Sequence, residues 1–163
     1  MGKGGRKEVI YSLNFITMAF VYKYNSAGGD PTIEAFRVAN VAVTRGSVAY
    51  FDASGWVSNV WAAANTVLTT TLLGVADETI TASGTDGSTT LAVVVTKDAR
   101  YIADTTGAVE QTDIGTNVTL DTILVADEDD PVTDNTGTVK MLKVNGVAGT
   151  ATQALVSLNF GTP

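Results

Sequence analysis

Cysteine and histidine are both absent from the 163 residues of this chain, and proline occurs only three times. Their absence excludes disulfide bonds, zinc sites built from Cys and His, thiol nucleophiles and any Ser-His-Asp triad. Charged residues are also few, at 17%, so the long-chain residues that favour helices are scarce. The chain thus lacks the side chains on which several large enzyme classes and most helical folds depend.

Thr, Val, Ala, Gly and Asp are the abundant residues instead. Val and Thr suit a pleated, half-buried surface, and Gly and Asp suit turns. We therefore predict an all-β protein: a small β-barrel or sandwich of short antiparallel strands, with an extended N-terminal arm. Residues 1–35 are interpreted as the arm and its linker and 36–163 as the β domain, with two very small domains as the alternative. Only the segment 56–68 has helical spacing, enough for one or two turns.

The net charge of -7 is unevenly distributed. Residues 1–45 hold six basic and three acidic side chains, whereas residues 46–163 hold four basic and fourteen acidic ones. An acidic body argues against nucleic acid as a partner, because nucleic-acid binding needs a basic face. A basic leading segment on an acidic body favours docking to a partner of opposite charge, and solubility alone is the simpler explanation.

The first two dozen residues combine a basic, glycine-rich start with the apolar run 9–21. This run is shorter than the roughly 20 apolar residues that span a membrane, and no small-x-small cleavage site follows it. Read at a period of two, it has the alternation of a strand with one mostly apolar side. We expect a retained arm that binds a partner and no membrane. The residues predicted to bind that partner are Lys3, Arg6, Lys7, Tyr11, Leu13, Phe15 and Phe20.

Two short motifs recur in the body of the chain. The pattern D-x-[ST]-G-x-V begins at Asp52 and again at Asp104, and Val-Ala-Asp-Glu occurs at 75–78 and 125–128. Asp at the first position and Gly at the fourth is typical of a type I turn. The similar offsets predict a duplicated hairpin unit with an acidic tip.

A search for chemistry finds no clear site. The acidic run 127–130, with Asp134 nearby, lacks the alternating oxygen ligands around a glycine that calcium loops use, so we interpret it as a solvated loop and expect no metal. No carboxylate pair stands out as acid and base, and no phosphate-binding glycine loop occurs. Trp56 and Trp61 are interpreted as core residues, with a sugar-stacking or interface role as the alternative. We therefore expect neither an enzyme nor a cofactor.

Four stretches carry a resemblance to a known family. They are RGSVAYFDASGWV, LLGVADETI, DARYIADTTGAVEQTDIG and the closing QALVSLNF. Over about residues 38–160 the chain resembles the small decoration, or cement, proteins of tailed-bacteriophage capsids. The resemblance implies a β-rich virion protein without catalysis, on the outer capsid surface. It also implies a homo-oligomer, with a trimer favoured, that bridges subunits of the major capsid protein. The long N-terminal segment departs from the family and would also suit a head-fibre base or a minor virion protein.

Three functions follow as hypotheses. A virion protein that joins capsid subunits through its arm should keep a folded body, but lose shell binding, when residues 1–24 are deleted. A secreted or surface-exposed β-module that binds glycans should be cleaved near residue 20 and use Trp56 and Trp61. A carboxylate enzyme is the third hypothesis, and it requires turn aspartates that share one cleft.

Overall fold

The computed structural model describes residues 20–59, 71–122, 125–132 and 138–160. In these residues the chain forms eleven β-strands and one short 3-10 turn, η1 (Gln111–Asp113), and no α-helix, so the all-β prediction is confirmed. The strands are β1 (Phe20–Asn25), β2 (Ile33–Arg37), β3 (Val48–Phe51), β4 (Val57–Ser58), β5 (Leu72–Ala76), β6 (Thr90–Val94), β7 (Ala99–Thr105), β8 (Asn117–Thr122), β9 (Val125–Val132), β10 (Val139–Val144) and β11 (Gln153–Leu158).

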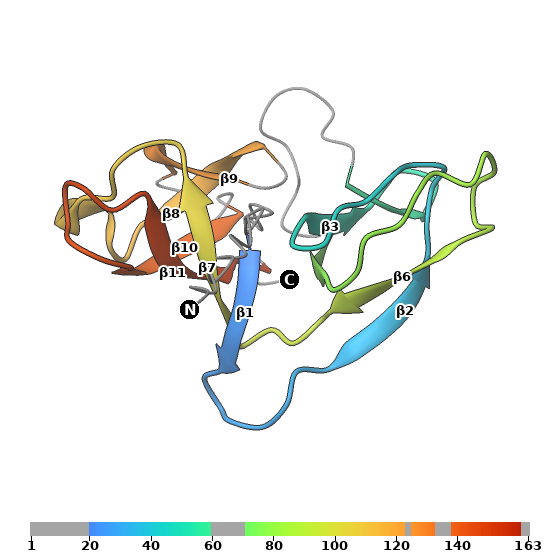
Figure 1. Cartoon of the computed structure of the whole chain (residues 1–163), viewed down its shortest axis with the longest axis horizontal. Coiled ribbons are helices and arrows are strands. Elements are labelled where there is room, and N and C mark those ends of the chain that lie inside the picture. Colours follow the sequence, from blue (N-terminus) through green and yellow to red (C-terminus); the bar gives the residue numbers. More distant parts are fainter. Residues whose placement is uncertain (1–19, 60–70, 123–124, 133–137, 161–163) are drawn as a thin grey trace, which may run out of the picture.

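The strands form two modules side by side (Figure 1). The C-terminal module contains β7 to β11 in the spatial order β7-β11-β10-β8-β9. A parallel pairing of Asp104 and Thr105 in β7 with Val125 and Ala126 in β9 closes this sheet into a barrel. Closure removes the free edges that an open sheet would present.

Strand β1 joins the C-terminal module from the segment that the sequence analysis interprets as an arm. It pairs antiparallel with β7, from Phe20 opposite Ala103 to Asn25 opposite Ala99. Strand β11 pairs along one edge of β7. Strands β1 and β9 both pair along the opposite edge, β1 with residues 99–103 and β9 with the next two residues. The predicted boundary at residue 35 falls inside β2.

The N-terminal module contains β2 to β6 in the spatial order β2-β6-β5-β3-β4. A parallel bridge between Val38 and Val57 brings the continuation of β2 beside β4, and Ala39 N donates to Val57 O at 2.9 Å. The two edges of this sheet therefore meet as well. Val57 and Ser58 form β4, so no helix begins there; residues 60–68 of the segment expected to allow a helix lie outside the described ranges.

The two modules share one topology. When β2 to β6 are matched in order to β7 to β11, the two spatial orders become identical, and the parallel contact that closes the sheet joins the first and third strands in both modules. The chain is therefore built from two copies of a five-stranded unit. The repeated unit is a whole module rather than a hairpin.

Equivalent turns support this correspondence. Gly46 and Gly115 both have a positive φ, at 86° and 93°, a region that glycine enters without steric cost. Gly46 N donates to Ala76 O, and Gly115 N donates to Met141 O in the same way. The residue after each glycine, Ser47 or Thr116, bonds back through its hydroxyl to the carbonyl three residues earlier. In the sequence, the repeat therefore leaves one short trace: Gly46-Ser47 in the N-terminal module corresponds to Gly115-Thr116 in the C-terminal module.

The sequence echo that begins at Asp52 and Asp104 does not mark this repeat. Asp52 does open a hairpin between β3 and β4, where its carboxylate accepts hydrogen bonds from Ser54 N and Trp56 N. Asp104 instead lies within β7, where its carboxylate accepts a hydrogen bond from Gln153 Nε2 across to β11. The prediction of a second hairpin was wrong. The turn-forming residues that begin at Asp104 lie at the end of β7, which pairs with β9 and β11 rather than with the segment that follows it directly.

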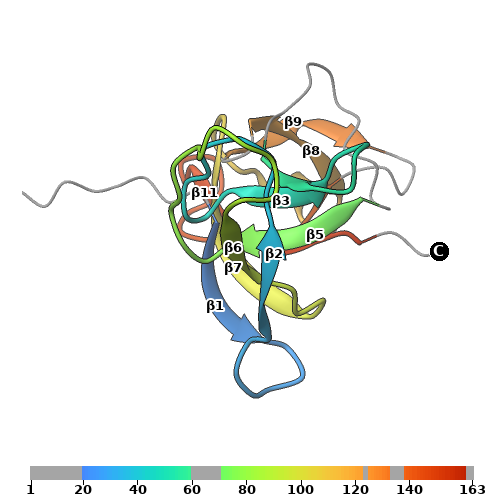
Figure 2. The ribbon, with the colours of Figure 1, turned by 90° about the vertical axis from the view of Figure 1, so that its right-hand side faces the viewer.

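Two paired segments connect the modules. The segment between β1 and β2 runs beside the segment between β6 and β7, with Ser26 N donating to Asp98 O and Val95 N donating to Thr32 O, each at 3.0 Å. The loop between β1 and β2 projects beyond both modules (Figures 1 and 2). This double connection restrains the modules more than a single linker would.

Each module contributes to a different part of the core. One buried cluster fills the N-terminal module around Val38, Val57 and Leu91. The larger cluster fills the C-terminal barrel around Leu120 and Met141 and extends to the N-terminal module. The residues that carry this extension are Val48, Leu72, Val75 and Val94. Apolar packing therefore joins the modules directly.

Candidate binding site between the modules

Of the residues predicted to bind a partner, the structure describes Phe20. The other six, Lys3, Arg6, Lys7, Tyr11, Leu13 and Phe15, lie outside the described ranges. Phe20 is 2% exposed, in the larger core cluster, and its ring meets that of Tyr101 edge to face at 6.3 Å. The structure thus gives Phe20 a role in the core of its own chain.

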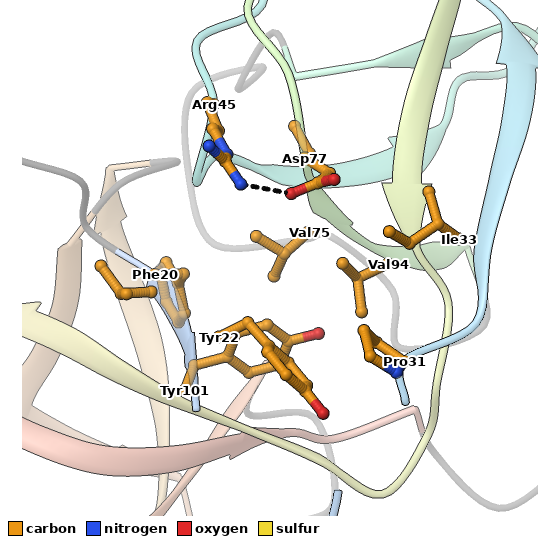
Figure 3. A pocket seen from close by; sticks show the side chains of 11 residues that line it. Phe20, Tyr22, Pro31, Ile33, Arg45, Val75, Asp77, Val94 and Tyr101 are labelled. Atoms are coloured by element: carbon orange, nitrogen blue, oxygen red, sulfur yellow. Dashed lines mark hydrogen bonds and ion pairs between the residues drawn. The ribbon is translucent and has the colours of Figure 1, made fainter. Parts of the chain in front are cut away.

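A cleft of about 400 Å³ lies where the two modules meet (Figure 3). Strand β1 supplies one wall through Phe20, Val21 and Tyr22, and the opposite wall comes from the N-terminal module. The remaining lining residues are Pro31, Ile33, Arg45, Val75, Ala76, Asp77, Val94 and Tyr101. The volume and the mostly apolar lining fall within the range of known ligand-binding clefts.

Polar groups converge on this cleft from two sides. Arg45 and Asp77 form an ion pair at 2.8 Å on the N-terminal module, with both side chains partly exposed. The side chains of Tyr22 and Tyr101 extend from the β1 side, and their hydroxyl groups point toward Pro31 and Val94 (Figure 3). The cleft therefore offers apolar walls together with charge and hydrogen-bonding groups, the combination that gives a binding site orientation and specificity.

The hydroxyl of Tyr101 is the unusual group in the cleft. Tyr101 is 1% exposed, and its hydroxyl has no hydrogen-bond partner among the residues that the structure describes. Burial raises the pKa of this hydroxyl well above its usual range, and the neighbouring Tyr22 raises it further. The group is therefore a protonated donor without an acceptor, and such a group destabilises the fold unless something binds it.

The raised pKa predicts a steeper loss of stability in alkali. Above a pH of about 10 the unfolded chain releases the Tyr101 proton, while the folded chain keeps it, so the unfolding free energy falls as pH rises. Denaturant titrations from neutral to alkaline pH should show this slope in the native chain. Tyr101→Phe should reduce the slope by up to about 1.4 kcal/mol per pH unit. Equal slopes in the native and Tyr101→Phe proteins would contradict the prediction.

The acidic run 127–130 belongs to β9, so the prediction of a solvated loop was wrong for these residues. Glu128 is 4% exposed, and its carboxylate accepts a hydrogen bond from Thr106 Oγ1 at 2.8 Å. Asp130 accepts one from Thr119 Oγ1 at 2.9 Å. Within the described ranges no three acidic side chains gather as a metal site would require. Strand contacts rather than turns organise these carboxylates.

Of the two tryptophans considered for a sugar-stacking surface, the structure describes one. Trp61 lies outside the described ranges, and Trp56 is half-buried. The Trp56 ring lies so close to Gly87 that a methyl group there would overlap it. Trp56 therefore packs against its own chain, but it belongs to neither core cluster, so its interpretation as a core residue is not confirmed.

The cleft is not predictable from the sequence. Tyr22 and Tyr101, or Ile33 and Val94, are distant in sequence, and only strand pairing brings them together. The local signal was limited to two predicted strands, one within the apolar run 9–21 and one over 99–103. Neither strand pattern reveals which other strand lies opposite.

Comparison with known proteins assigns the chain to no family. No family model and no curated protein matches the chain. In the part of the chain that is described, no helix is long and apolar enough to cross a membrane. The described residues form two five-stranded β modules of one topology, with a mostly apolar cleft where the modules meet.

Proposed function

We propose that this chain is a structural protein of a bacteriophage particle. In this proposal it binds the outer surface of the capsid, bridges neighbouring subunits of the major capsid protein and acts as a homo-oligomer, with a trimer favoured. Catalysis forms no part of the proposed role. The support comes from the pairing of β1 and β9 along β7 and from the charge of the residues before β1.

The observation that carries the proposal is that β9 occupies the edge of β7 directly beyond Ala103, the partner of Phe20. Phe20 pairs with Ala103, and the next residues of β7, Asp104 and Thr105, already pair with β9. A strand that continued upstream of Phe20 would therefore meet an occupied edge. The apolar segment before Phe20 needs another surface to cover it, and a neighbouring subunit offers one by strand addition.

Charge gives the segment a second means of attachment. Lys3, Arg6 and Lys7 stand near the start of a segment of 19 residues that spans up to roughly 65 Å when extended. A folded chain of this length has a radius of gyration of only about 15 Å. In an extended conformation the segment would carry the basic residues well beyond their own body, as a tether between subunits requires.

The test is binding to purified capsid shells that lack this protein. Changing Lys3, Arg6 and Lys7 together to glutamate should weaken binding by about a hundredfold. The matched control changes three lysines of the body, Lys97, Lys140 and Lys143, to glutamate and should bind as the native chain does. Equal weakening in both variants, or no binding by the native chain, would refute the arm's role.

The deletion that tests the arm should end before β1, at residue 19, and not at residue 24 as the sequence suggested. Deleting residues 1–24 would remove most of β1 together with the buried Phe20 ring, so loss of binding would be confounded by loss of stability. Deleting residues 1–19 keeps β1 and its pairing with β7. This shorter deletion should leave the body folded, as its circular dichroism spectrum would show, and abolish shell binding. The glycan-binding alternative requires Trp56 together with Trp61, and Trp61 lies outside the described ranges.

A further inference from the structure

The cleft between the modules has apolar surface that nothing in the described chain covers. Val21 and Ile33 line it and are 38% and 47% exposed. They are two of the five large apolar side chains that the described residues expose. Exposed apolar side chains that gather at a cleft are typical of a binding site.

The Tyr101 hydroxyl restricts what binds there. It is a buried donor that lines the cleft and lacks an acceptor among the described residues. A purely hydrocarbon ligand would leave it unsatisfied, whereas the backbone carbonyl of an extended peptide would accept its hydrogen bond. Apolar walls and an unpaired donor together fit an apolar peptide segment.

The chain contains such a segment in residues 9–16. Tyr11, Leu13 and Phe15 alternate there on one face, and the segment ends only four residues before Phe20, which lines the cleft. The three residues between the segment and Phe20, Thr17, Met18 and Ala19, include none of the Gly, Pro, Asn, Asp and Ser residues that dominate tight turns. A reversal into the cleft of the same copy is therefore disfavoured, and the cleft of a second copy becomes the accessible one.

We propose that the cleft binds the segment 9–16 of a second copy of this chain. Its apolar face packs against Val21, Ile33 and Val94, and one of its backbone carbonyls accepts a hydrogen bond from Tyr101. Each copy donates one segment and receives one, so that identical contacts close a ring. The inference goes beyond the proposed function, because it names a homotypic contact that is independent of any capsid.

A peptide-binding experiment tests the inference on the full-length chain. The probe is a fluorescent synthetic peptide of residues 1–19, and the receptor carries Leu13→Asp and Phe15→Asp so that its own segment does not compete. Fluorescence anisotropy should show saturable binding. Adding Ile33→Asp should weaken that binding by about tenfold or more. Val147→Asp is the matched control, because Val147 is 72% exposed in the turn after β10 and does not line the cleft.

Tyr101→Phe separates the hydrogen bond from the apolar contact. It should weaken peptide binding by about fivefold while leaving the thermal midpoint unchanged or higher, because it removes a hydroxyl that is unsatisfied without the peptide. No binding, equal binding to the Ile33→Asp receptor, or full affinity for the Tyr101→Phe receptor would overturn the inference.

Sedimentation separates this inference from the proposed function. The native chain should self-associate, and Ile33→Asp should shift it toward the monomer, whereas Val147→Asp should not. A native chain that stays monomeric, or that crosslinks residues 9–16 to its own cleft, overturns the inference. If shells still bind such a monomer, the proposed function stands alone; if the chain self-associates through the cleft but binds no shell, the proposed function fails alone.

Discussion

Replacing Gly74 with alanine is expected to lower the free energy of unfolding by about 3 kcal/mol. Gly74 lies in β5, and a methyl group built on it would overlap the carbonyl oxygen of Val94 and press on the Val93 side chain in β6. The obstructing atom belongs to the backbone, so β5 and β6 would have to move apart at the centre of the N-terminal module. Urea denaturation followed by circular dichroism measures the loss.

Gly107→Ala is the matched control for this change. The methyl group at Gly107 would meet the carboxylate end of the Glu128 side chain, which moves at less cost than backbone does. Neither glycine has a positive φ, so steric overlap accounts for the difference between them. We expect Gly107→Ala to cost clearly less than Gly74→Ala. Equal losses, or a Gly74→Ala protein of native stability, would show that the sheet relaxes freely around Gly74.

Replacing Phe20 with alanine is expected to cost about 3–5 kcal/mol, the usual cost of removing a buried phenylalanine. Phe20 is buried and packs against Tyr101, so its removal leaves a cavity between β1 and the barrel. Tyr24→Ala on the same strand removes an aromatic ring that is 49% exposed and should cost less than about 1 kcal/mol. Denaturant unfolding distinguishes the two outcomes.

This pair of variants also decides what Phe20 does. A residue that served only to bind a partner would leave the stability of the isolated chain unchanged when replaced, because its ring would be exposed in the absence of that partner. A Phe20→Ala protein as stable as the native chain would therefore contradict its place in the core and restore it to the arm.

The all-β class could be predicted because the evidence for it is local. Runs such as 47–51 and 99–103 show β-branched and aromatic residues at a period of two, and both form strands, β3 and β7. Asp52 could be assigned to a turn for the same reason: its side chain bonds to backbone groups two and four residues later. Such features depend on neighbours in the sequence, which a single chain reveals.

The repeat was harder to predict because the topology, rather than the sequence, carries it. The matching motifs at Asp52 and Asp104 consist of turn-forming residues, but they lie at positions that do not correspond in the two modules. They therefore suggested a repeat period shorter than the true one. The equivalent pair is Gly46 and Gly115, two glycines held by hydrogen bonds to residues 76 and 141. Those bonds join distant segments, and the local match, Gly-Ser against Gly-Thr, is only two residues long and gave too little signal to be recognised.

The cleft could not be predicted for a related reason. Tyr101 was expected in a strand, and it is in one, but its burial depends on Phe20 and Tyr22, which pair with β7 from the far end of the sequence. The alternation of a strand indicates which side chains share a face. It does not indicate that another strand will cover that face, or that the cover will leave a hydroxyl without an acceptor.

The position of β1 has a consequence for biosynthesis. As the chain leaves the ribosome, β2 to β6 emerge together and contain every strand that the N-terminal module requires. Strand β1 emerges before them, yet its partner β7 emerges only after them. The nascent chain must therefore keep the Phe20 side of β1 uncovered while a complete module folds behind it. Although β1 is translated before both modules, it is among the last strands to reach its native place.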